Sequence, residues 1–408
     1  MPLLTETRPA NPAIRVAMAF KIRDEGDVLE HNLRFHHALG VDHFIVTDNG
    51  STDETVGILA RYAEAGLLTA IEAPNTDYRE QGAQWMTDMA RLAATELGAD
   101  WVVHTDADEF WWPIEGTLKE TLAAVHDRYG VLLAPRCEFI GRPDGPGSFA
   151  ERLTIREARS RYQPKVAHRA DPDVVSIDRG PHDVAAVGPS GEVTETIRPP
   201  GRPVHRVIRN RELGASSWPE EDTRFVWAPW WPVRILHFPV RSSAQFRRRT
   251  QIAIFEGMFP DRGRFRRLRE HYEEGRFAEL YRELIFDESE VDAGLEAGRL
   301  VVDERFAQLL ARCPDPLAGG PSGSLRVEPS PQELERDRAA LEFDAMHVLA
   351  RTSRWLMVNR DRNRERLAKV MEQRDAAQAR AQGLQRTTRV RRFRLWRWLQ
   401  RVFGRRRG

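Results

Sequence analysis

Short apolar runs alternate with amphipathic stretches along the first third of the chain. The apolar runs, residues 14–20, 43–47, 67–71 and 101–103, are typical of buried strands. The stretches between them place apolar residues at helical spacing, and each is followed by glycine, as expected at a helix end. This alternation predicts an α/β fold with a doubly wound, mostly parallel sheet. The predicted helices are residues 27–39, 53–65 and 81–97.

Polar side chains follow the first, second and fourth apolar runs. Asp106 and Asp108 stand one residue apart after the fourth run. Neighbouring carboxylates repel each other, so a chain places them together chiefly to hold a cation. The carboxyl ends of parallel strands lie at the edge where open α/β sheets bind ligands. The pair therefore predicts a divalent cation that bridges protein and phosphate oxygens, although aspartates also cap turns.

The regular alternation continues with a predicted helix at 118–129 and a strand at 131–139, and then stops. Residues 141–203 are rich in Gly, Pro, Arg and His, and we interpret them as the irregular half of the same domain, where an acceptor site is assembled. Residues 14–312 are predicted to form one domain after a tail at 1–13, with a donor half at 14–140 and an acceptor half at 141–312. Later predicted elements are strands at 174–177 and 233–240 and helices at 242–255 and 265–284.

The C-terminal part differs in composition from this domain. Residues 313–331, with Gly-Gly-Pro-Ser-Gly-Ser at their centre, are predicted to be a linker. Residues 332–385 contain no proline and predict a long helix, a C-terminal extension through which two copies of the chain could associate. Its weak heptad places an apolar residue at Leu334, Leu341, Val348 and Trp355.

The last segment, residues 386–408, is basic. It holds ten of the 62 Lys and Arg residues and no acidic residue, so the remaining chain is mildly acidic. A mildly acidic body argues against a nucleic-acid partner. Within residues 390–407, bulky apolar side chains and arginines fall on opposite sides of a helical wheel, which predicts contact with an anionic membrane surface. The alternatives are a helix that packs on a partner subunit and a disordered basic tail.

Several features predict a cytoplasmic protein, peripheral to the inner face of a membrane. The two cysteines, Cys137 and Cys313, are far apart and form no disulfide framework, as in a reducing compartment. The first twelve residues lack the apolar region of a secretory signal, and no apolar run approaches the ~20 residues that span a bilayer.

Three motifs, Asp24-Glu25, residues 40–53 and residues 101–110, resemble family 2 glycosyltransferases, in the branch whose motif is Asp-x-Asp-Glu-Phe. The resemblance implies a GT-A-type fold. It implies transfer of a sugar, with inversion, from a nucleotide-sugar donor to a glycan or lipid-linked acceptor of surface-polysaccharide type. The implied cofactor is Mn²⁺ or Mg²⁺.

The resemblance also implies roles for residues of the donor site. Asp108 would contact the metal directly and Asp106 the metal or the ribose, while Asp48 would hold the ribose or the nucleobase. Two further residues, Asn49 and Ser51, would shape the Asp48 loop. Glu25 would lie near the nucleoside.

Roles downstream are open between alternatives. His237, in a strand-like run, is our candidate for a further metal ligand, with His182 as its rival, although a lone histidine on an apolar strand is more often a core residue. An inverting transferase needs a base for the acceptor hydroxyl, and Asp183 and Glu138 are the candidates. Lys165 and Arg241 are candidates for diphosphate contacts, against the alternative of solvated surface charge.

Three other functions compete. Phosphoryl-transfer enzymes with a nucleophilic aspartate place Asp-x-Asp after the first strand, whereas here three strand–helix units precede it. Nucleotidyltransferases share a similar sheet, but the first strand here is not followed by a glycine-rich signature loop. A catalytically inactive nucleotide-sugar-binding or scaffold module is the remaining alternative.

Overall fold

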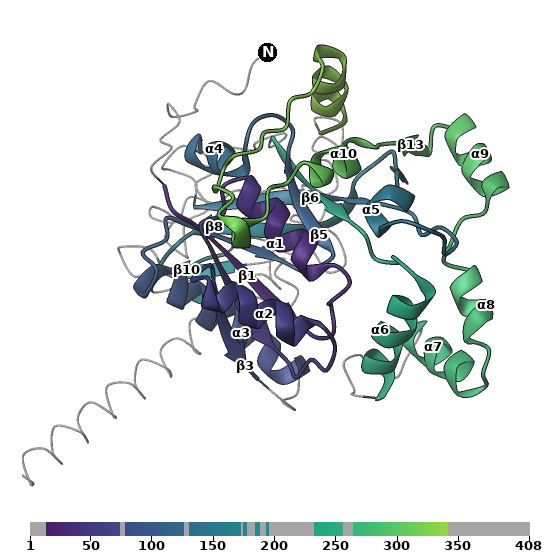
Figure 1. The fold of residues 1–408 in the computed structure, drawn as a ribbon, viewed down its shortest axis with the longest axis horizontal. Helices are drawn as coiled ribbons and strands as arrows, with labels where there is room; N and C mark the ends of the chain where they lie inside the picture. Colours follow the sequence, from purple (N-terminus) through teal and green to yellow (C-terminus); the bar gives the residue numbers. More distant parts are fainter. Residues whose placement is uncertain are drawn as a thin grey trace, which may run out of the picture. The chain divides into compact units, whose positions relative to one another are not determined.

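The computed structural model describes most of the first of two units into which the chain divides, Met1–Trp355 and Leu356–Gly408 (Figure 1). The second unit lies outside the described residues. The predicted membrane-surface segment falls there, as do the last residues of the predicted long helix. The described residues are 14–73, 78–125, 130–172, 174–177, 184–187, 193–195, 232–255 and 264–341.

An eight-stranded sheet forms the centre of the body. Its strands are β1 (Val16–Ile22), β2 (His43–Asp48), β3 (Leu68–Glu72), β4 (Trp101–Thr105), β5 (Glu109–Pro113), β6 (Val131–Glu138), β8 (Arg161–Arg169) and β12 (Val233–His237). They are ordered β3-β2-β1-β4-β8-β6-β12-β5. Only β8 and β5 run antiparallel to their neighbours. The carboxyl ends of β1, β2, β4, β6 and β12 therefore share one edge.

Helices cover both faces of the parallel half. Successive strand residues point to opposite faces, so Met18 and Phe20 pack with α1 (Leu29–Ala38) and α2 (Thr55–Glu64). The alternate residues of β1, Ala17 and Ala19, pack with α3 (Tyr78–Thr95) on the other face. This arrangement confirms the predicted α/β class and its doubly wound first half. The structure also confirms the four strands and three helices expected there, with boundaries shifted by a few residues.

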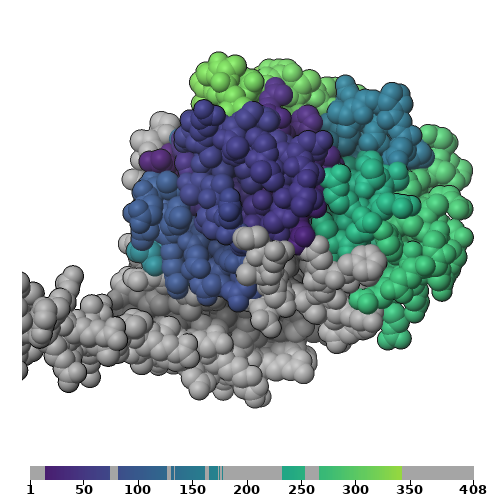
Figure 2. Space-filling view, turned by 60° about the horizontal axis from the view of Figure 1, so that its bottom comes forward, coloured from purple at the N-terminus to yellow at the C-terminus, as the bar shows by residue number. Residues whose placement is uncertain are grey.

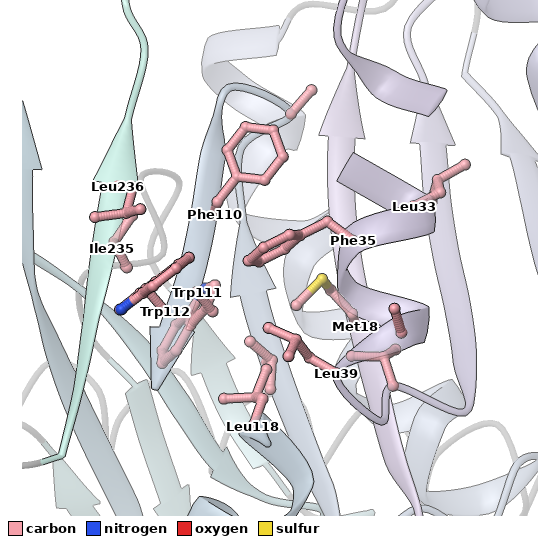
Figure 3. Packing of buried hydrophobic residues seen from close by; sticks show 14 of the residues in the cluster. Met18, Leu33, Phe35, Leu39, Phe110, Trp111, Trp112, Leu118, Ile235 and Leu236 are labelled. Atoms are coloured by element: carbon pink, nitrogen blue, oxygen red, sulfur yellow. The ribbon is translucent and has the colours of Figure 1, made fainter. Parts of the chain in front are cut away.

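Aromatic side chains fill the space between α1 and the second half of the sheet. Phe35 of α1 points toward Phe110 and Trp112 of β5 (Figure 3), with ring centroids 5.4 and 6.2 Å away. Phe110 also packs edge-on against Phe306 at 4.5 Å and Phe238 at 5.7 Å. These rings bury a large apolar area directly beneath the start of β5, and so fix the segment that follows Asp108.

Two strands of this sheet were not predicted. Every residue of β5 is buried, so the strand has no alternation of apolar and polar residues, and it begins directly after Asp108. The other strand, β8, carries the buried lysine Lys165 in its interior. A charged residue at such a position does not indicate a buried strand.

The second half contains short elements that the sequence predicts only in part. The expected helix at 265–284 is two helices, because the chain turns at Gly275, whose φ of +72° suits glycine. The expected helix at 118–129 ends at Ala123, and residues 126–129 lie outside the described residues. The remaining helices are α4 (Leu118–Ala123), α5 (Phe149–Arg152), α6 (Ser243–Phe255), α7 (Arg264–Glu273), α8 (Phe277–Arg282), α9 (Glu288–Glu296) and α10 (Arg305–Ala311). The remaining strands are β7 (Ile155–Glu157), β9 (Val174–Ile177), β10 (Val184–Val187), β11 (Val193–Glu195) and β13 (Leu300–Val302).

Residues 313–331, expected to be a linker, run along the body instead of away from it. The backbone N–H of Leu325 donates to the carbonyl of Ala38, and Val327 pairs with Gly116. Leu325 and Val327 are buried in the main core. A composition rich in Gly, Pro and Ser therefore gives a docked segment here, because backbone bonds and two apolar anchors hold it.

Residues 331–341 are helical, which agrees with the start of the predicted long helix. Asp337 of this helix lies 3.0 Å from Arg234 of β12 and 2.9 Å from Arg305. The heptad positions beyond Leu341 lie outside the described residues. No helix in the described ranges is long and apolar enough to cross a membrane.

Candidate functional site

The turn Asp106-Ala107-Asp108 joins β4 to β5, and a buried residue of α1 holds it in place. The Asn32 side-chain amide donates to the carbonyls of Ala107 (2.9 Å) and Glu109 (2.8 Å). Both bonds are buried, and each satisfies a carbonyl that the turn leaves without a ladder partner. The helix thus fixes the backbone between the two predicted carboxylates.

His36, one turn along α1, supports this amide. Its Nε2 accepts from the backbone N–H of Trp111 at 2.9 Å, so its proton is on Nδ1. Nδ1 then donates to the Asn32 side-chain oxygen at 2.6 Å. Burial lowers the pKa of His36 to about 3, which keeps the ring neutral and this bonding pattern unchanged at neutral pH.

Asp106 faces a buried lysine. Lys165 Nζ lies 2.5 Å from Asp106 Oδ2 and 3.2 Å from Glu109 Oε2. The Lys165 side chain is 1% exposed, whereas that of Asp106 is 39% exposed. Loss of hydration would raise the pKa of Asp106, but Lys165 and Lys21 hold it below its ordinary value.

Asp108 lies deeper, with a side chain that is 3% exposed, and several cationic or donor groups approach its Oδ2. Arg249 Nη1 is 2.8 Å away, His237 Nε2 3.5 Å and Arg241 Nη1 3.6 Å. Burial would raise the pKa of Asp108, yet His237 and Arg249 hold it well below its ordinary value. Asp108 is therefore ionised at neutral pH.

His237 ends β12 beside Asp108, where the sequence placed a metal ligand. Its Nδ1 lies 2.7 Å from Glu138 Oε2. Burial would lower the pKa of His237, but the Asp108 and Glu138 carboxylates raise it above its ordinary value. The structure thus brings His237 and Asp108 together, while the rival His182 and the candidate base Asp183 lie outside the described residues.

Glu138 has contacts that differ from those of a free catalytic base. One carboxylate oxygen accepts from Arg136 Nε at 2.7 Å, and the other contacts His237. The residue is buried. These contacts favour a positioning role, in which Glu138 orients His237, over the predicted role as the acceptor base.

The loop after β2 is held by its own polar side chains. Asp48 Oδ1 accepts from the backbone N–H and the hydroxyl of Ser51, at 3.0 and 2.6 Å. Asn49, which is buried, donates from its amide to the carbonyl of Ala73 at 2.8 Å. Asp24, whose φ is +51°, accepts from Thr52 N–H at 2.6 Å and joins this loop to the one after β1.

Arg241 ties the loop after β1 to the end of β12. Its buried guanidinium contacts Glu25 at 2.7 Å and Asp27 at 2.7 Å. Burial raises the pKa of Glu25 to about 7, although Arg241 opposes the shift. Arg241 was a candidate for a diphosphate contact, but these bonds occupy it, and in the structure it positions Glu25 near Asp108.

Helix α6 closes this edge. Its surface adjoins that of the first helices in the space-filling view, where teal meets purple (Figure 2). Arg248 lies 2.5 Å from Asp53, and Arg249 reaches Asp108. Arg249 was absent from the sequence-based candidates because three consecutive arginines look alike in sequence, and only the turn of the helix separates their surroundings.

The donor set suits a hard divalent cation only in part. Two carboxylates and an imidazole are ligands that Mn²⁺ and Mg²⁺ accept. Within the described ranges, however, no group of three or more His, Cys, Asp or Glu side chains is already arranged to hold a metal. Asp106 points to Lys165, and Arg249 caps Asp108. The residues fit a metal provided that these two ion pairs open.

Comparison with known proteins gives one family match. The model of glycosyltransferase family 92 matches residues 27–138, which is 112 of the 408 residues. The matched segment contains Asp48, Asp106, Asp108 and Glu138, and it ends before Lys165 and His237. No curated protein matches the chain.

Solved structures match the chain at low similarity. S. aureus TarS 1–349 is 17% identical with a TM-score of 0.26, over 38% of this chain and 47% of that one. Its complex with UDP-GlcNAc is 18% identical with the same score, over 38% and 46%. Glucosyl-3-phosphoglycerate synthase from Mycobacterium tuberculosis is 19% identical with a TM-score of 0.20, over 35% and 48%. The chain thus spans a little under half the length of each.

The matched family agrees with the predicted class of protein, a glycosyltransferase. The family number differs, because the sequence motifs resembled family 2 and the matching model is that of family 92. Membership of family 2 and the Asp-x-Asp-Glu-Phe branch stay predictions.

Proposed function

We propose that this protein transfers a sugar from a nucleotide-sugar donor to a glycan or lipid-linked acceptor. The observation that carries the proposal is the surroundings of Asp108: an ionised, buried carboxylate at the carboxyl end of β4, contacted by His237 and Arg249. The Asp48 loop lies at the same edge of the sheet. The family match over residues 27–138 supports the same class of reaction.

The departing nucleoside diphosphate develops negative charge, and the site offers positive charge for it. A divalent cation held by Asp106, Asp108 and His237 would act there as a Lewis acid. A metal-bound His237 would be neutral and would donate its Nδ1 proton to Glu138, which would leave the Nε2 lone pair for the metal. Lys165, at the opposite end of the turn, adds a fixed ammonium.

The nucleoside half of the donor fits the Asp48 loop. Ser51 fixes the Asp48 carboxylate from one side, so its position is set before a ligand arrives. In the proposal this carboxylate accepts from a ribose hydroxyl or a base N–H. Glu25, held by Arg241, borders the same space.

The acceptor hydroxyl needs a base if the transfer inverts the anomeric centre. Because Glu138 is bound to Arg136 and His237, we assign that role to Asp183, which lies outside the described residues.

The proposed association through residues 332–385 and membrane contact through 390–407 fall largely or wholly outside the described residues as well. Anionic liposomes that bind the whole chain, but not a chain truncated after Gln385, would support the membrane contact, and equal binding of the two would refute it.

Thermal-shift measurements with a panel of nucleotide sugars and Mn²⁺ test donor binding. A donor at 100 times its dissociation constant should stabilise the protein by about 2.7 kcal/mol. Asp48→Ala should abolish that shift. Asp88→Ala, a matched control at an exposed carboxylate of α3, should keep it. A panel with no effect on the wild type would contradict the proposal.

A binding module without turnover is the second candidate. It is favoured by Lys165 and Arg249, which neutralise both carboxylates of the turn without a metal. The two functions separate in one assay. A module shows the thermal shift but releases no nucleoside diphosphate from any donor, with or without added acceptor extracts.

A further inference from the structure

The ion pair between Arg249 and Asp108 joins an exposed cation to a buried anion. The Arg249 side chain is 46% exposed, and its Nη1 is 2.8 Å from Asp108 Oδ2. Its further contact is a long one of 3.5 Å to the carbonyl of Pro239. The buried anion is therefore closed off from solvent by a side chain with few other constraints.

The neighbouring Arg241, unlike Arg249, is held in one position by several hydrogen bonds. Its side chain is buried and bonded to Glu25, Asp27 and the carbonyl of Phe238. Moving it would break four hydrogen bonds and leave two carboxylates without their partner. Arg249 can move by side-chain rotation alone, at the expense of one ion pair.

A divalent cation would compete with Arg249 for the same atom. Asp108 Oδ2 is also the oxygen nearest His237 Nε2, so a metal held by these two residues would bind this oxygen. The guanidinium, 2.8 Å from that oxygen, would then face a double positive charge at close range. A bound donor brings a diphosphate to the same metal, and a guanidinium matches phosphate oxygens in a two-pronged geometry.

We propose that Arg249 is an exchangeable cation, which pairs with Asp108 while the site is empty and moves to the donor diphosphate when a divalent cation binds. This proposal rests on the proposed function, since the diphosphate is that of the donor. While no metal is bound, Arg249 offsets part of the charge of Asp108, which His237 and Arg241 also approach. In the loaded site it contacts the leaving group.

Two binding measurements on the full chain test the exchange, and neither needs turnover. Isothermal titration with Mn²⁺ alone should show about fivefold tighter binding to Arg249→Gln than to wild type, because a competing ion pair is gone. Titration with nucleoside diphosphates (UDP, GDP, ADP and dTDP) at saturating Mn²⁺ should show about tenfold weaker binding of the accepted one to the variant. The exchange therefore predicts that the affinity of the variant rises for Mn²⁺ and falls for the nucleoside diphosphate.

Two further variants control the result. Arg247 lies on the same helix with its guanidinium 4.8 Å from the Phe277 ring centroid, and Arg247→Gln should change neither affinity. Arg249→Lys keeps the charge without the planar fork, so Mn²⁺ binding should match wild type while nucleoside diphosphate binding falls.

Each remaining outcome overturns the proposal. If Arg249→Gln weakens both ligands or leaves both unchanged, Arg249 has a structural role or none. If neither protein binds Mn²⁺ but the variant binds the diphosphate less well, Arg249 is a fixed substitute for the metal. If wild type binds a nucleoside diphosphate normally in those cases, the proposed function survives; if it binds none, both proposals fail.

Discussion

The two carboxylates of the turn are held in opposite ways. Asp106 is partly exposed and its partner Lys165 is buried, whereas Asp108 is buried and its partner Arg249 is exposed. At one end the cation is fixed and the anion can turn toward a ligand. At the other end the anion is fixed and the cation can leave. The turn therefore carries two different kinds of ion pair, although the sequence shows two similar aspartates.

Acid should destabilise the folded protein through three buried histidines, His36 of α1, His104 of β4 and His168 of β8. Burial lowers the pKa of His36 to about 3 and the pKa of His168 to about 4. Burial also lowers the pKa of His104 well below its ordinary value of 6.5. Unfolded chains bind protons at these sites below pH 6.5 while the folded protein does not, so stability falls as the pH drops below 6.5. At pH 5 His36 and His168 should each contribute about 2 kcal/mol of destabilisation.

Urea unfolding at pH 7.5, 6 and 5 checks this expectation. His237 and Glu25, whose pKa values are raised, work in the opposite direction, but the three histidines outnumber them. The His36→Gln variant cannot titrate and should show a shallower loss of stability with acid. A stability that is flat from pH 7.5 to 5 in wild type would contradict the neutral, buried state of these rings.

Removing the cation of each pair should destabilise the protein by different amounts at the two ends of the turn. Lys165→Met leaves Asp106 without its partner and takes the ammonium from Glu109, so it should cost about 3–5 kcal/mol. Arg249→Gln removes a half-exposed guanidinium and should cost less than about 1 kcal/mol. Chemical denaturation of both variants measures the difference. Equal losses of unfolding free energy in the two variants would show that the two ion pairs are alike and would contradict the comparison.

A smaller effect is expected from the residue that orients His237. Glu138→Gln keeps the shape of the side chain but removes the charge that favours the Nδ1 proton. Such a change beside a metal ligand should weaken Mn²⁺ binding by about 10- to 100-fold. Calorimetric titration with Mn²⁺ tests it, with Glu157→Gln on β7 as a matched control. An unchanged Mn²⁺ affinity would mean that His237 does not bind the metal.

The sequence predicts the parallel half of the fold and the centre of the site well. The strands up to β4 are short apolar runs, the helices follow a period of 3.6 with glycines at their ends, and Asp106 and Asp108 stand at a strand end as expected. These features depend on local patterns, which a single sequence records. His237 was a candidate because the resembled fold often brings a late histidine to the metal, whereas its strand-like run alone favours a core residue.

The features that sequence reasoning could not supply depend on contacts between distant segments. β5 is a short run that begins with Glu109 and ends with Pro113, and its partner in the sheet is the distant β12. Lys165 lies in a strand interior, where only the carboxylates of Asp106 and Glu109 make a buried ammonium tolerable. Asn32 and His36 are polar residues on the apolar face of α1, a signal for a buried network that the helical spacing alone obscured.

The most direct test of a donor site centred on Asp108 is release of nucleoside diphosphate from nucleotide sugars with Mn²⁺. Wild type should turn over at least one donor of the panel. Asp108→Asn should be slower by about 10³-fold or more, because charge on the leaving group loses its stabilisation, and Asp106→Asn should fall between the two. Both variants should unfold cooperatively. An Asp108→Asn protein that releases the diphosphate as fast as wild type would contradict the account.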